Sequence, residues 1–365
     1  MSNLIQVLPE GALDIIGDVH GEYEALCALL KNLGYDTRKN GVHSDGRKMV
    51  FVGDLVDRGP DSPAVIKLVR RMIDAGNAYA VIGNHELNLL REKAKDGSGW
   101  YFDERQEKDR HYSPFKRVDN NDKEGLVEFI SSLPVALERK DLRVVHAAWC
   151  KEQIDYLRQA ECTGVVCCYE KFADGINKHI NSTGLLDRYR EEQNKWSEYL
   201  EDEVLKAPFL HDTAAYQVAH QMMNPVRVLT SGVERKTSIP FYASHKWRFV
   251  ERVAWWNEYS DDVPVVVGHY WRKLVGDSTR NKDETNVFEN VAPTSWHGAK
   301  GNVFCVDFSV GGRYSERNKN LPYGTEANLA ALRWPERTLM LEDGAVLDTS
   351  CYLSCKNESS TALEL

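Results

Sequence analysis

Three short loops in the first quarter of the sequence carry acidic, histidine and asparagine side chains directly after apolar runs. The runs cover residues 12–16, 49–52 and 78–82, and the loops are Gly17-Asp18-Val19-His20-Gly21, Gly53-Asp54-Leu55-Val56-Asp57-Arg58-Gly59 and Gly83-Asn84-His85-Glu86. Each run has the composition of a buried strand, and a helical pattern follows each loop. Open α/β sheets bind ligands at the carboxyl ends of their parallel strands. We therefore expect the polar side chains of all three loops to share one site.

The connections between these strands have the spacing of amphipathic helices. One pattern starts after Gly21 and ends at Gly34, and a second starts after Pro60 and ends at Gly76. Glycine directly after the last apolar position is typical of a helix end. Parallel neighbouring strands need such crossovers, so residues 12–90 predict the core of an α/β fold.

The rest of the chain adds further strands and a long insertion. Residues 91–123 are predicted as a charged excursion, Glu124 to Ser132 as a helix, and 329–347 as two antiparallel strands. The other expected strands are Val135 to Leu137, Leu142 to Val145, Val226 to Thr230, Pro264 to Val267 and Val303 to Phe308. We expect residues 1–365 to form a single catalytic domain.

Residues 151–245 are predicted as a mostly helical insertion or cap over the active site, with one helix from about Leu186 to Leu205. The polar loop at 276–300 has no predicted role, and the polar tail at 356–365 is expected to be flexible. Helical packing against the sheet is favoured over nucleobase stacking for five aromatic residues: Trp247, Phe249, Trp255, Trp256 and Tyr259.

Composition limits the range of partners. The formal net charge of −9 argues against a broad contact with duplex nucleic acid, which depends on clustered Lys and Arg. No apolar run approaches the roughly 18 residues of a membrane span, and residues 1–13 lack the pattern of a signal peptide. Eight scattered cysteines are expected to be reduced thiols. These observations predict a cytoplasmic protein without a membrane partner.

The chemistry of the loops indicates a pair of divalent metal ions. Carboxylate, imidazole and carboxamide ligands suit Mn²⁺, Fe²⁺ or Zn²⁺. Two metals about 3.5–4 Å apart can hold a hydroxide and stabilise an in-line displacement at phosphorus. A bridging ligand must offer two oxygens, and Asp54 is the central carboxylate of the series.

These segments resemble the signature of the PPP-type metallophosphoesterases with the calcineurin-like fold. The resemblance is strongest near the symmetrical diadenosine tetraphosphate hydrolases and the bacterial serine/threonine protein phosphatases, and the group includes phosphatase domains of polynucleotide kinase-phosphatases. It implies a four-layer α/β-β/α sandwich. Cys305-Val306-Asp307 with Gly311-Gly312-Arg313 resembles the closing strands of the diadenosine tetraphosphate hydrolases.

The resemblance also implies the metal ligands and two metal ions, with manganese as the expected metal and iron or zinc as alternatives. Six side chains would bind them: Asp18, His20, Asp54, Asn84, His146 and His269. His146 and His269 each follow a predicted strand, as the family pattern requires. Family members usually have His-Gly-Gly where this chain has His146-Ala147-Ala148, so the loop beside His146 should differ in its backbone geometry.

The resemblance assigns the remaining roles to residues near these ligands. Arg58 would bind the phosphate bidentately, with Asn84 also contributing to phosphate binding. His85 would protonate the leaving oxygen and Asp57 would orient it. The second phosphate-binding arginine of the family has no clear counterpart, and Arg235 is our hypothesis for it.

The expected reaction is hydrolysis of a phosphate monoester or phosphoanhydride by a metal-bridging hydroxide. Nucleotide-like or small substrates such as dinucleoside polyphosphates are favoured, because a long cap suits a small substrate better than a protein surface. A serine/threonine protein phosphatase and a phosphatase of RNA or DNA ends are alternatives within the class. A catalytically silent regulatory or binding protein on the same fold is the alternative from a different class.

Overall fold

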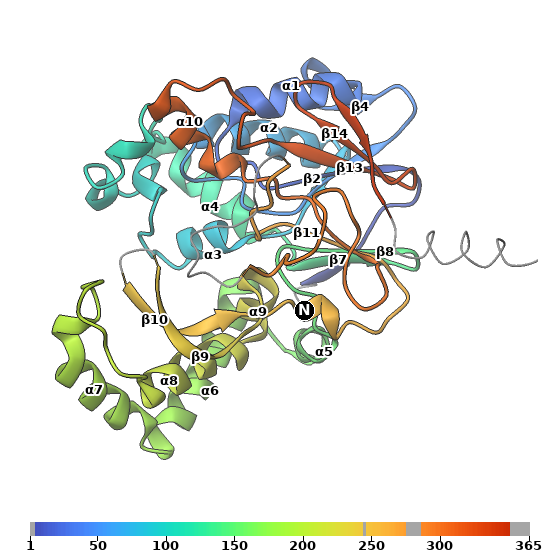
Figure 1. The fold of residues 1–365 in the computed structure, drawn as a ribbon. Coiled ribbons are helices and arrows are strands. Elements are labelled where there is room, and N and C mark those ends of the chain that lie inside the picture. Colours follow the sequence, from blue (N-terminus) through green and yellow to red (C-terminus); the bar gives the residue numbers. More distant parts are fainter. Residues whose placement is uncertain (1–3, 244–245, 275–285, 351–365) are drawn as a thin grey trace, which may run out of the picture.

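The computed structural model describes residues 4–243, 246–274 and 286–350. Two sheets stack face to face in it, and helices cover both outer faces (Figure 1). The six-stranded sheet has the order β15 (Val346–Asp348), β14 (Thr338–Leu341), β13 (Ala330–Trp334), β2 (Leu13–Ile16), β5 (Lys48–Phe51) and β6 (Ala78–Ala80). The five-stranded sheet has the order β1 (Ile5–Val7), β7 (Ala136–Arg139), β8 (Leu142–Val145), β11 (Val265–Val267) and β12 (Val303–Cys305). The expected four-layer sandwich is confirmed.

Parallel pairing aligns the ends of the strands that carry the predicted site. In the first sheet, β2, β5 and β6 pair in parallel. In the second sheet, β8, β11 and β12 do the same. Both sets of carboxyl ends therefore deliver their loops to one edge of the sandwich.

Alternating side chains separate the two faces of each sheet. Leu13 and Ile15 of β2 pack into the core between the sheets, whereas Ile16 packs into the outer core under the helices. Val144 of β8 and Val266 of β11 approach the inter-sheet core from the opposite side. This period of two is what a strand buried on both faces requires.

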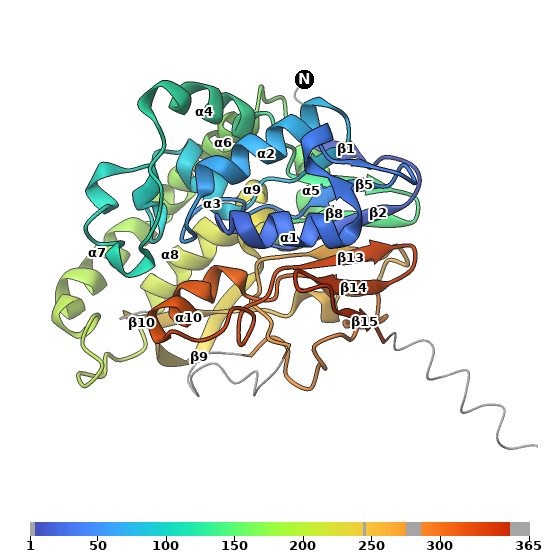
Figure 2. The same ribbon diagram turned by 90° about the horizontal axis from the view of Figure 1, so that it is seen from above.

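The helices follow the sequence pattern closely in the first half of the chain. Figures 1 and 2 show α1 (Tyr23–Leu33) and α2 (Ser62–Asp74) over the six-stranded sheet, and Figure 1 shows α5 (Lys151–Gln159) and α9 (Pro225–Ser231) beside the five-stranded sheet. Gly34 ends α1 with a φ of 95°, a conformation that glycine adopts without steric cost. The other helices near the core are α3 (Asn84–Leu90), α4 (Lys123–Ser131) and α10 (Arg313–Lys319), and a small hairpin pairs β3 (Tyr35–Asp36) with β4 (Val42–His43).

The segment predicted as a helical insertion contains both helices and a long strand. Three helices and a two-stranded ribbon form a lobe beside the sandwich, at the lower left of Figure 1. Its members are α6 (Val165–Ser182), α7 (Leu185–Trp196), α8 (His211–Met222), β9 (Glu234–Ala243) and β10 (Lys246–Arg252). The helix expected to reach about Leu205 ends as an α-helix at Trp196.

Several local predictions are wrong. Val226 to Thr230 is part of helix α9, because Pro225 starts the helix and the Asn224 side chain accepts a hydrogen bond from the Arg227 N–H. The closing segment has three strands, since Pro335 lies in an additional turn between β13 and β14.

The expected helical packing of the aromatic run is also wrong. Trp247 and Phe249 lie on β10, where residues two apart share one face. Trp255 and Trp256 lie in a short 3₁₀ turn that follows this strand.

One pair of cysteines departs from the expected thiols. Cys162 and Cys168 form a disulfide at the start of α6, where their Cα atoms lie 5.3 Å apart, within the normal reach of such a bond. Cys27, Cys150, Cys167 and Cys305 are free.

Part of the 276–300 loop and the predicted flexible tail lie outside the described residues. Among the helices that are described, none is long and apolar enough to span a bilayer.

Candidate active site

The predicted ligands meet at the edge where the strands of both sheets end. Asp18 and His20 follow β2, Asp54 follows β5, Asn84 begins α3 after β6, His146 follows β8, and His269 lies two residues after β11. The side chains of Asp18, His20, Asp54, His146 and His269 are all buried. Four strand ends of a twisted sandwich and the start of one helix thus bring distant parts of the sequence together.

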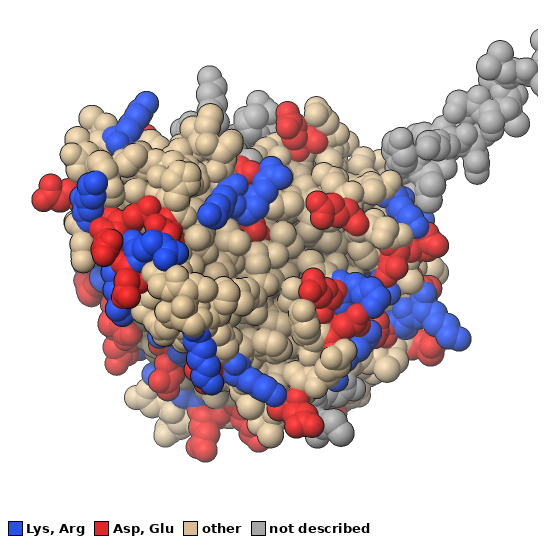
Figure 3. Space-filling view, turned by 90° about the horizontal axis from the view of Figure 1, so that it is seen from below, with Lys and Arg blue, Asp and Glu red and all other residues tan. Residues whose placement is uncertain are grey.

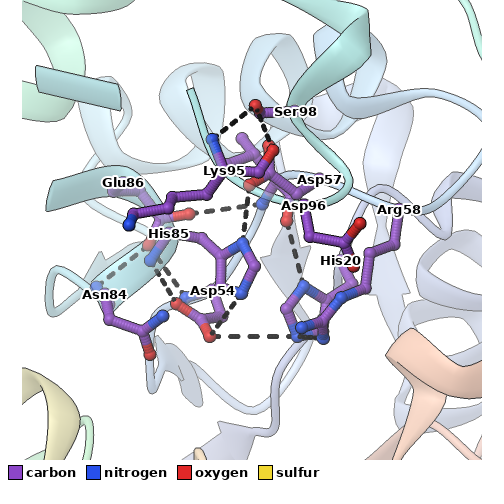
Figure 4. Close-up of polar contacts among 12 residues, drawn as sticks. His20, Asp54, Asp57, Arg58, Asn84, His85, Glu86, Lys95, Asp96 and Ser98 are labelled. Atoms are coloured by element: carbon purple, nitrogen blue, oxygen red, sulfur yellow. Dashed lines mark hydrogen bonds and ion pairs between the residues drawn. The ribbon is translucent and has the colours of Figure 1, made fainter. Parts of the chain in front are cut away.

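Asp54 lies at the centre of this group (Figure 4). Its Oδ2 lies 3.8 Å from His20 Nε2, 3.9 Å from His85 Nε2 and 3.4 Å from His146 Nε2. Two groups of candidate ligand atoms share it, each with its atoms within 4.8 Å of one another: His20 with Asp54 and His85, and Asp54 with His146 and His269. A carboxylate shared by two groups has the position that a bridging ligand needs.

Hydrogen bonds to backbone carbonyls fix two of the imidazole rings. His20 Nδ1 donates to the Val56 carbonyl at 3.0 Å, and His146 Nδ1 donates to the Val52 carbonyl at 2.8 Å. Each bond leaves Nε2 as the ring nitrogen that lies nearest to Asp54. This arrangement is typical of histidines that bind metal.

The ionisable side chains around Asp54 shift one another's pKa values. Burial and the neighbouring charge of Asp307 raise the pKa of Asp18 well above its usual value. Burial alone would lower the pKa of His146, but Asp54 outweighs it and raises that pKa to about 10. Asn84 Oδ1 also lies 3.2 Å from His146 Nε2. Carboxylate, carboxamide and imidazole acceptors that converge in this way fit divalent cations.

His269 contributes an unsatisfied nitrogen to the same place. Its Nε2 is buried and has no hydrogen-bond partner among the described residues. Burial and the charge of Arg252 hold its pKa well below the usual value, so the ring is neutral and can act as a ligand. Its backbone N–H donates to both oxygens of Asp18 at 3.2 Å. A Cβ on Gly268 would lie 2.1 Å from Asp18 Oδ1, so this close approach requires glycine.

His85 is held by the residue predicted to orient it. Its Nδ1 donates to Asp57 Oδ2 at 2.6 Å, and the second oxygen of Asp57 accepts from Trp100 Nε1, also at 2.6 Å. Although burial opposes it, the negative charges of Asp54 and Asp57 raise the pKa of His85. The geometry therefore has the form of a positioned general acid, with Trp100 as a partner that the sequence did not indicate.

Arg58 lies beside His20, at the same ring nitrogen that faces Asp54. Its NH1 donates to His20 Nε2 at 3.1 Å, and its guanidinium lies 4.7 Å from the centre of the Trp271 ring. The backbone N–H of Arg58 donates to the Gly97 carbonyl at 3.0 Å. The backbone and side chain of Arg58 are thus held by contacts with three separate segments.

Backbone strain is concentrated in these loops. Positive φ angles occur at non-glycine residues of the site: His20 (45°), Asp54 (48°), Asp57 (75°), Arg58 (67°), His269 (70°) and Trp271 (46°). L-residues with side chains seldom adopt this region, and clusters of such residues are typical of functional sites.

Two buried acidic residues that we did not predict support the ligand loops. Glu86 accepts hydrogen bonds from the backbone N–H groups of Gly83, Asp54, Leu55 and Val56. Asp307 accepts from the backbone N–H groups of Trp271 and Ser309, each at 2.8 Å. The position of Asp307 shortly after strand β12 was a usable signal, because the other acidic ligands also follow strands.

Arg235, our hypothesis for the second phosphate-binding arginine, is not brought to this group. It lies on β9, with an exposed side chain that forms an ion pair with Glu251 at 2.7 Å. Arg252, at the end of β10, is the arginine whose charge lowers the pKa of His269. It makes no side-chain hydrogen bond or ion pair within the described part of the chain. Charge alone could not distinguish the two arginines, because the register of the β9–β10 ribbon pairs Arg235 with Glu251 and Arg252 with Glu234.

Comparison with known proteins agrees with this geometry. The family model of the calcineurin-like phosphoesterases matches residues 12–270. The chain therefore belongs to the calcineurin-like phosphoesterase family.

Two curated relatives share the name bis(5'-nucleosyl)-tetraphosphatase PrpE (asymmetrical). The protein from Oceanobacillus iheyensis is 39% identical over 146 residues, which cover 37% of this chain and 54% of that protein. The protein from Halalkalibacterium halodurans is 52% identical over 79 residues, which cover 21% of this chain and 32% of that protein. The chain thus spans about half or less of the length of these relatives.

Solved structures give a weaker likeness. A serine/threonine phosphatase from Saccharomyces cerevisiae aligns over 94% of this chain and 81% of its own, with 13% identity and a TM-score of 0.44.

Proposed function

We propose that this protein is a metal-dependent phosphoesterase that hydrolyses phosphoanhydride bonds of nucleotide-like substrates, with dinucleoside polyphosphates as the favoured class. The observation that carries the proposal is the position of Asp54, whose Oδ2 lies within 3.9 Å of imidazole nitrogens of His20, His85 and His146. Membership of the calcineurin-like phosphoesterase family supports the reaction class. The names of the two PrpE relatives support the substrate class.

Six residues would hold two divalent metal ions, with Asp54 as the shared ligand. The others are Asp18, His20, Asn84, His146 and His269. Manganese is our expectation, because the mixed oxygen and nitrogen donor set suits it. Bound divalent cations supply an activated water molecule and offset the charge of the reacting phosphoryl group.

The protein's own side chains would bind the phosphate and move the proton. Arg58 would donate two parallel hydrogen bonds to phosphate oxygens, and Asn84 would add another. Arg252, in place of Arg235, is our proposal for the second arginine at the phosphate. His85, oriented by Asp57, would give a proton to the leaving oxygen.

The lobe formed within residues 151–252 would act as a cap that selects the substrate. We propose that the sandwich and the lobe work as one catalytic domain, and that the protein acts in the cytoplasm.

Figure 3 shows one face of the molecule on which Lys and Arg alternate with Asp and Glu around a broad uncharged area. This face offers no continuous positive surface for a duplex.

Product analysis tests the proposal. Full-length protein with Mn²⁺ should hydrolyse p-nitrophenyl phosphate and diadenosine tetraphosphate, and chromatography identifies the nucleotides. The symmetrical reaction, which the sequence resemblance implies, releases two ADP; the asymmetrical reaction, which the names of the relatives specify, releases ATP and AMP. Activity on a phosphopeptide or a 5′-triphosphorylated RNA, and not on the dinucleotide, would overturn the substrate class.

Variants test the assigned roles in the same assay. Asp54→Asn should lower kcat by at least about 100-fold, because it removes the carboxylate charge that would hold both cations. Arg58→Ala and Arg252→Ala should each raise KM, whereas Lys236→Ala, an exposed position on β9, serves as the control. Wild-type turnover by Asp54→Asn would exclude the metal arrangement, and an unchanged KM in Arg252→Ala would remove that residue from the site.

A further inference from the structure

We propose that Lys95 and Arg227, here called the distal cations, form a subsite for phosphate groups beyond the one under attack. The inference rests on the proposed function, because it extends the same site toward a longer substrate. The two residues come from the loop after α3 and from α9, and no sequence motif pointed to either.

The loop that carries Lys95 is tied to the phosphate-binding side of the site. Ser98 Oγ accepts from the Lys95 N–H at 3.1 Å and donates to the Lys95 carbonyl at 2.6 Å, which makes a tight turn. Within this turn, the Gly97 carbonyl accepts from the Arg58 N–H at 3.0 Å. Figure 4 shows the Lys95 side chain, which has no polar partner among the described residues, in the same close-up as Asn84. The turn therefore fixes the backbone position from which the Lys95 side chain extends.

Arg227 is anchored beside the histidine ligand of the second sheet. Two residues further along α9, the Leu229 carbonyl accepts from the Ala147 N–H at 2.9 Å, directly after His146. Arg227 Nε donates to Gln221 Oε1 at 2.6 Å, and Gln221 is only 1% exposed. This buried amide orients the guanidinium and leaves both terminal nitrogens without a hydrogen-bond partner among the residues described.

The Gln221 side chain is itself fixed, so the orientation of Arg227 is built into the fold. Gln221 Nε2 donates to the Gly232 carbonyl at 2.7 Å. An arginine held through Nε and open at its two terminal nitrogens presents the fork that phosphate oxygens bind.

The distal cations lie in one region of positive charge. Burial and then the charge of Arg227 lower the pKa of Lys95. The charges of Arg227, Arg252 and Arg248 all act on Glu234, whose pKa burial raises. Glu234 forms no ion pair with any described residue, so it does not neutralise them directly. An anion bound here would relieve the mutual repulsion of these cations.

The ligand that fits is a short chain of phosphates. The candidate metal ligands and Arg58 would surround the position of one phosphoryl group, and the charge of Arg252 acts both on His269 and, together with Arg227, on Glu234. A dinucleoside tetraphosphate carries three more phosphates, which need cations outside that position. A phosphoserine peptide carries a single phosphate and would not need the distal cations.

Tripolyphosphate and orthophosphate provide a binding test that is independent of turnover. Calorimetry on the full chain with Mn²⁺ should give a Kd for tripolyphosphate at least about tenfold below that for orthophosphate in the wild type. Lys95→Met removes the charge but keeps the aliphatic stem, and it should weaken tripolyphosphate binding about fivefold to tenfold. Arg227→Gln should do the same, and Lys236→Ala is the control with an equal loss of charge.

Kinetics separate this proposal from the proposed function. The ratio of kcat/KM for diadenosine tetraphosphate to that for p-nitrophenyl phosphate should fall at least fivefold in Lys95→Met. An unchanged ratio, or equal losses of affinity for both phosphates, would overturn the subsite. If the wild type does not cleave the dinucleotide, the proposed substrate is wrong, and the calorimetric result alone decides whether the distal cations bind phosphate. Arg227→Lys keeps a charge at α9 and should bind tripolyphosphate better than Arg227→Gln; the reverse order would also count against the subsite.

Discussion

At the scale of single residues, the site joins His85, our proposed proton donor, to carboxylates whose charges raise its pKa against the effect of burial. His85 is held by Asp57 at 2.6 Å, and Trp100 fixes that carboxylate from the other side. A general acid matters most when the leaving oxygen is strongly basic. Alkoxides are strong bases, whereas the phosphate oxygen released from an anhydride is a weak one.

This difference gives a prediction for His85→Ala. The variant should lose about 100-fold or more in kcat on an alkyl phosphate, and clearly less on p-nitrophenyl phosphate or diadenosine tetraphosphate. Steady-state kinetics with the three substrates measures it, and Asp57→Asn should show the same order with smaller losses. Equal losses on all three would mean that His85 supports Asp54, whose Oδ2 lies 3.9 Å from its Nε2, and does not act as the acid.

The sequence predicted the site residues that directly follow strands and missed those whose positions depend on tertiary packing. Asp18 and Asp54 were found because parallel strands bring their ends to one edge. Trp100 was missed because it reaches Asp57 from a charged loop without a periodic pattern. Arg252 was missed because the register of a ribbon, which spacing does not reveal, sets its position.

At the scale of secondary structure, α3 joins two ligand loops through one buried carboxylate. Glu86 accepts from four backbone N–H groups, three of them in the loop after β5 and one at Gly83. Buried N–H groups without a partner are costly, at about 1–3 kcal/mol each. The conformation of the Asp54 loop therefore depends on a buried residue of helix α3.

We expect Glu86→Ala to lower the free energy of unfolding by at least about 3 kcal/mol, since several donors lose their acceptor together. Urea denaturation of the metal-free protein measures the loss. Glu86→Gln keeps one carbonyl acceptor, so its free energy of unfolding should lie between those of Glu86→Ala and the wild type. A loss below about 1 kcal/mol in Glu86→Ala would show that water replaces the carboxylate.

Helices and strands were predicted well where the pattern was long and poorly where it was short. The helices after Gly21 and Pro60 have two or more turns of regular spacing, and both were found. The apolar run Val226 to Thr230 is too short to separate a helix from a buried strand by periodicity. Asn224 and Pro225 before it were the decisive signal, since they form a helix start.

At the scale of the whole molecule, the candidate ligands come from both sheets of the sandwich. Asp18 and Asp54 follow strands of the six-stranded sheet, whereas His146 and His269 follow strands of the five-stranded sheet. The apolar core between the sheets, which includes Ile15 and Phe304 among its buried residues, holds them together without metal. Bound cations would add a second connection at one edge, where buried carboxylates otherwise repel each other.

Metal binding should therefore stabilise the folded chain as a whole. A ligand at 100 times its Kd adds about 2.7 kcal/mol to the free energy of unfolding, so saturating Mn²⁺ should raise Tm by several degrees over the protein treated with EDTA. Thermal unfolding followed by circular dichroism measures the shift. Asp54→Asn should keep a cooperative transition in EDTA, because the inter-sheet core is intact, and should lose most of the increase with Mn²⁺. A wild-type Tm that is equal with and without metal would contradict a site that links the two sheets, because cations that bind only the folded state must stabilise it.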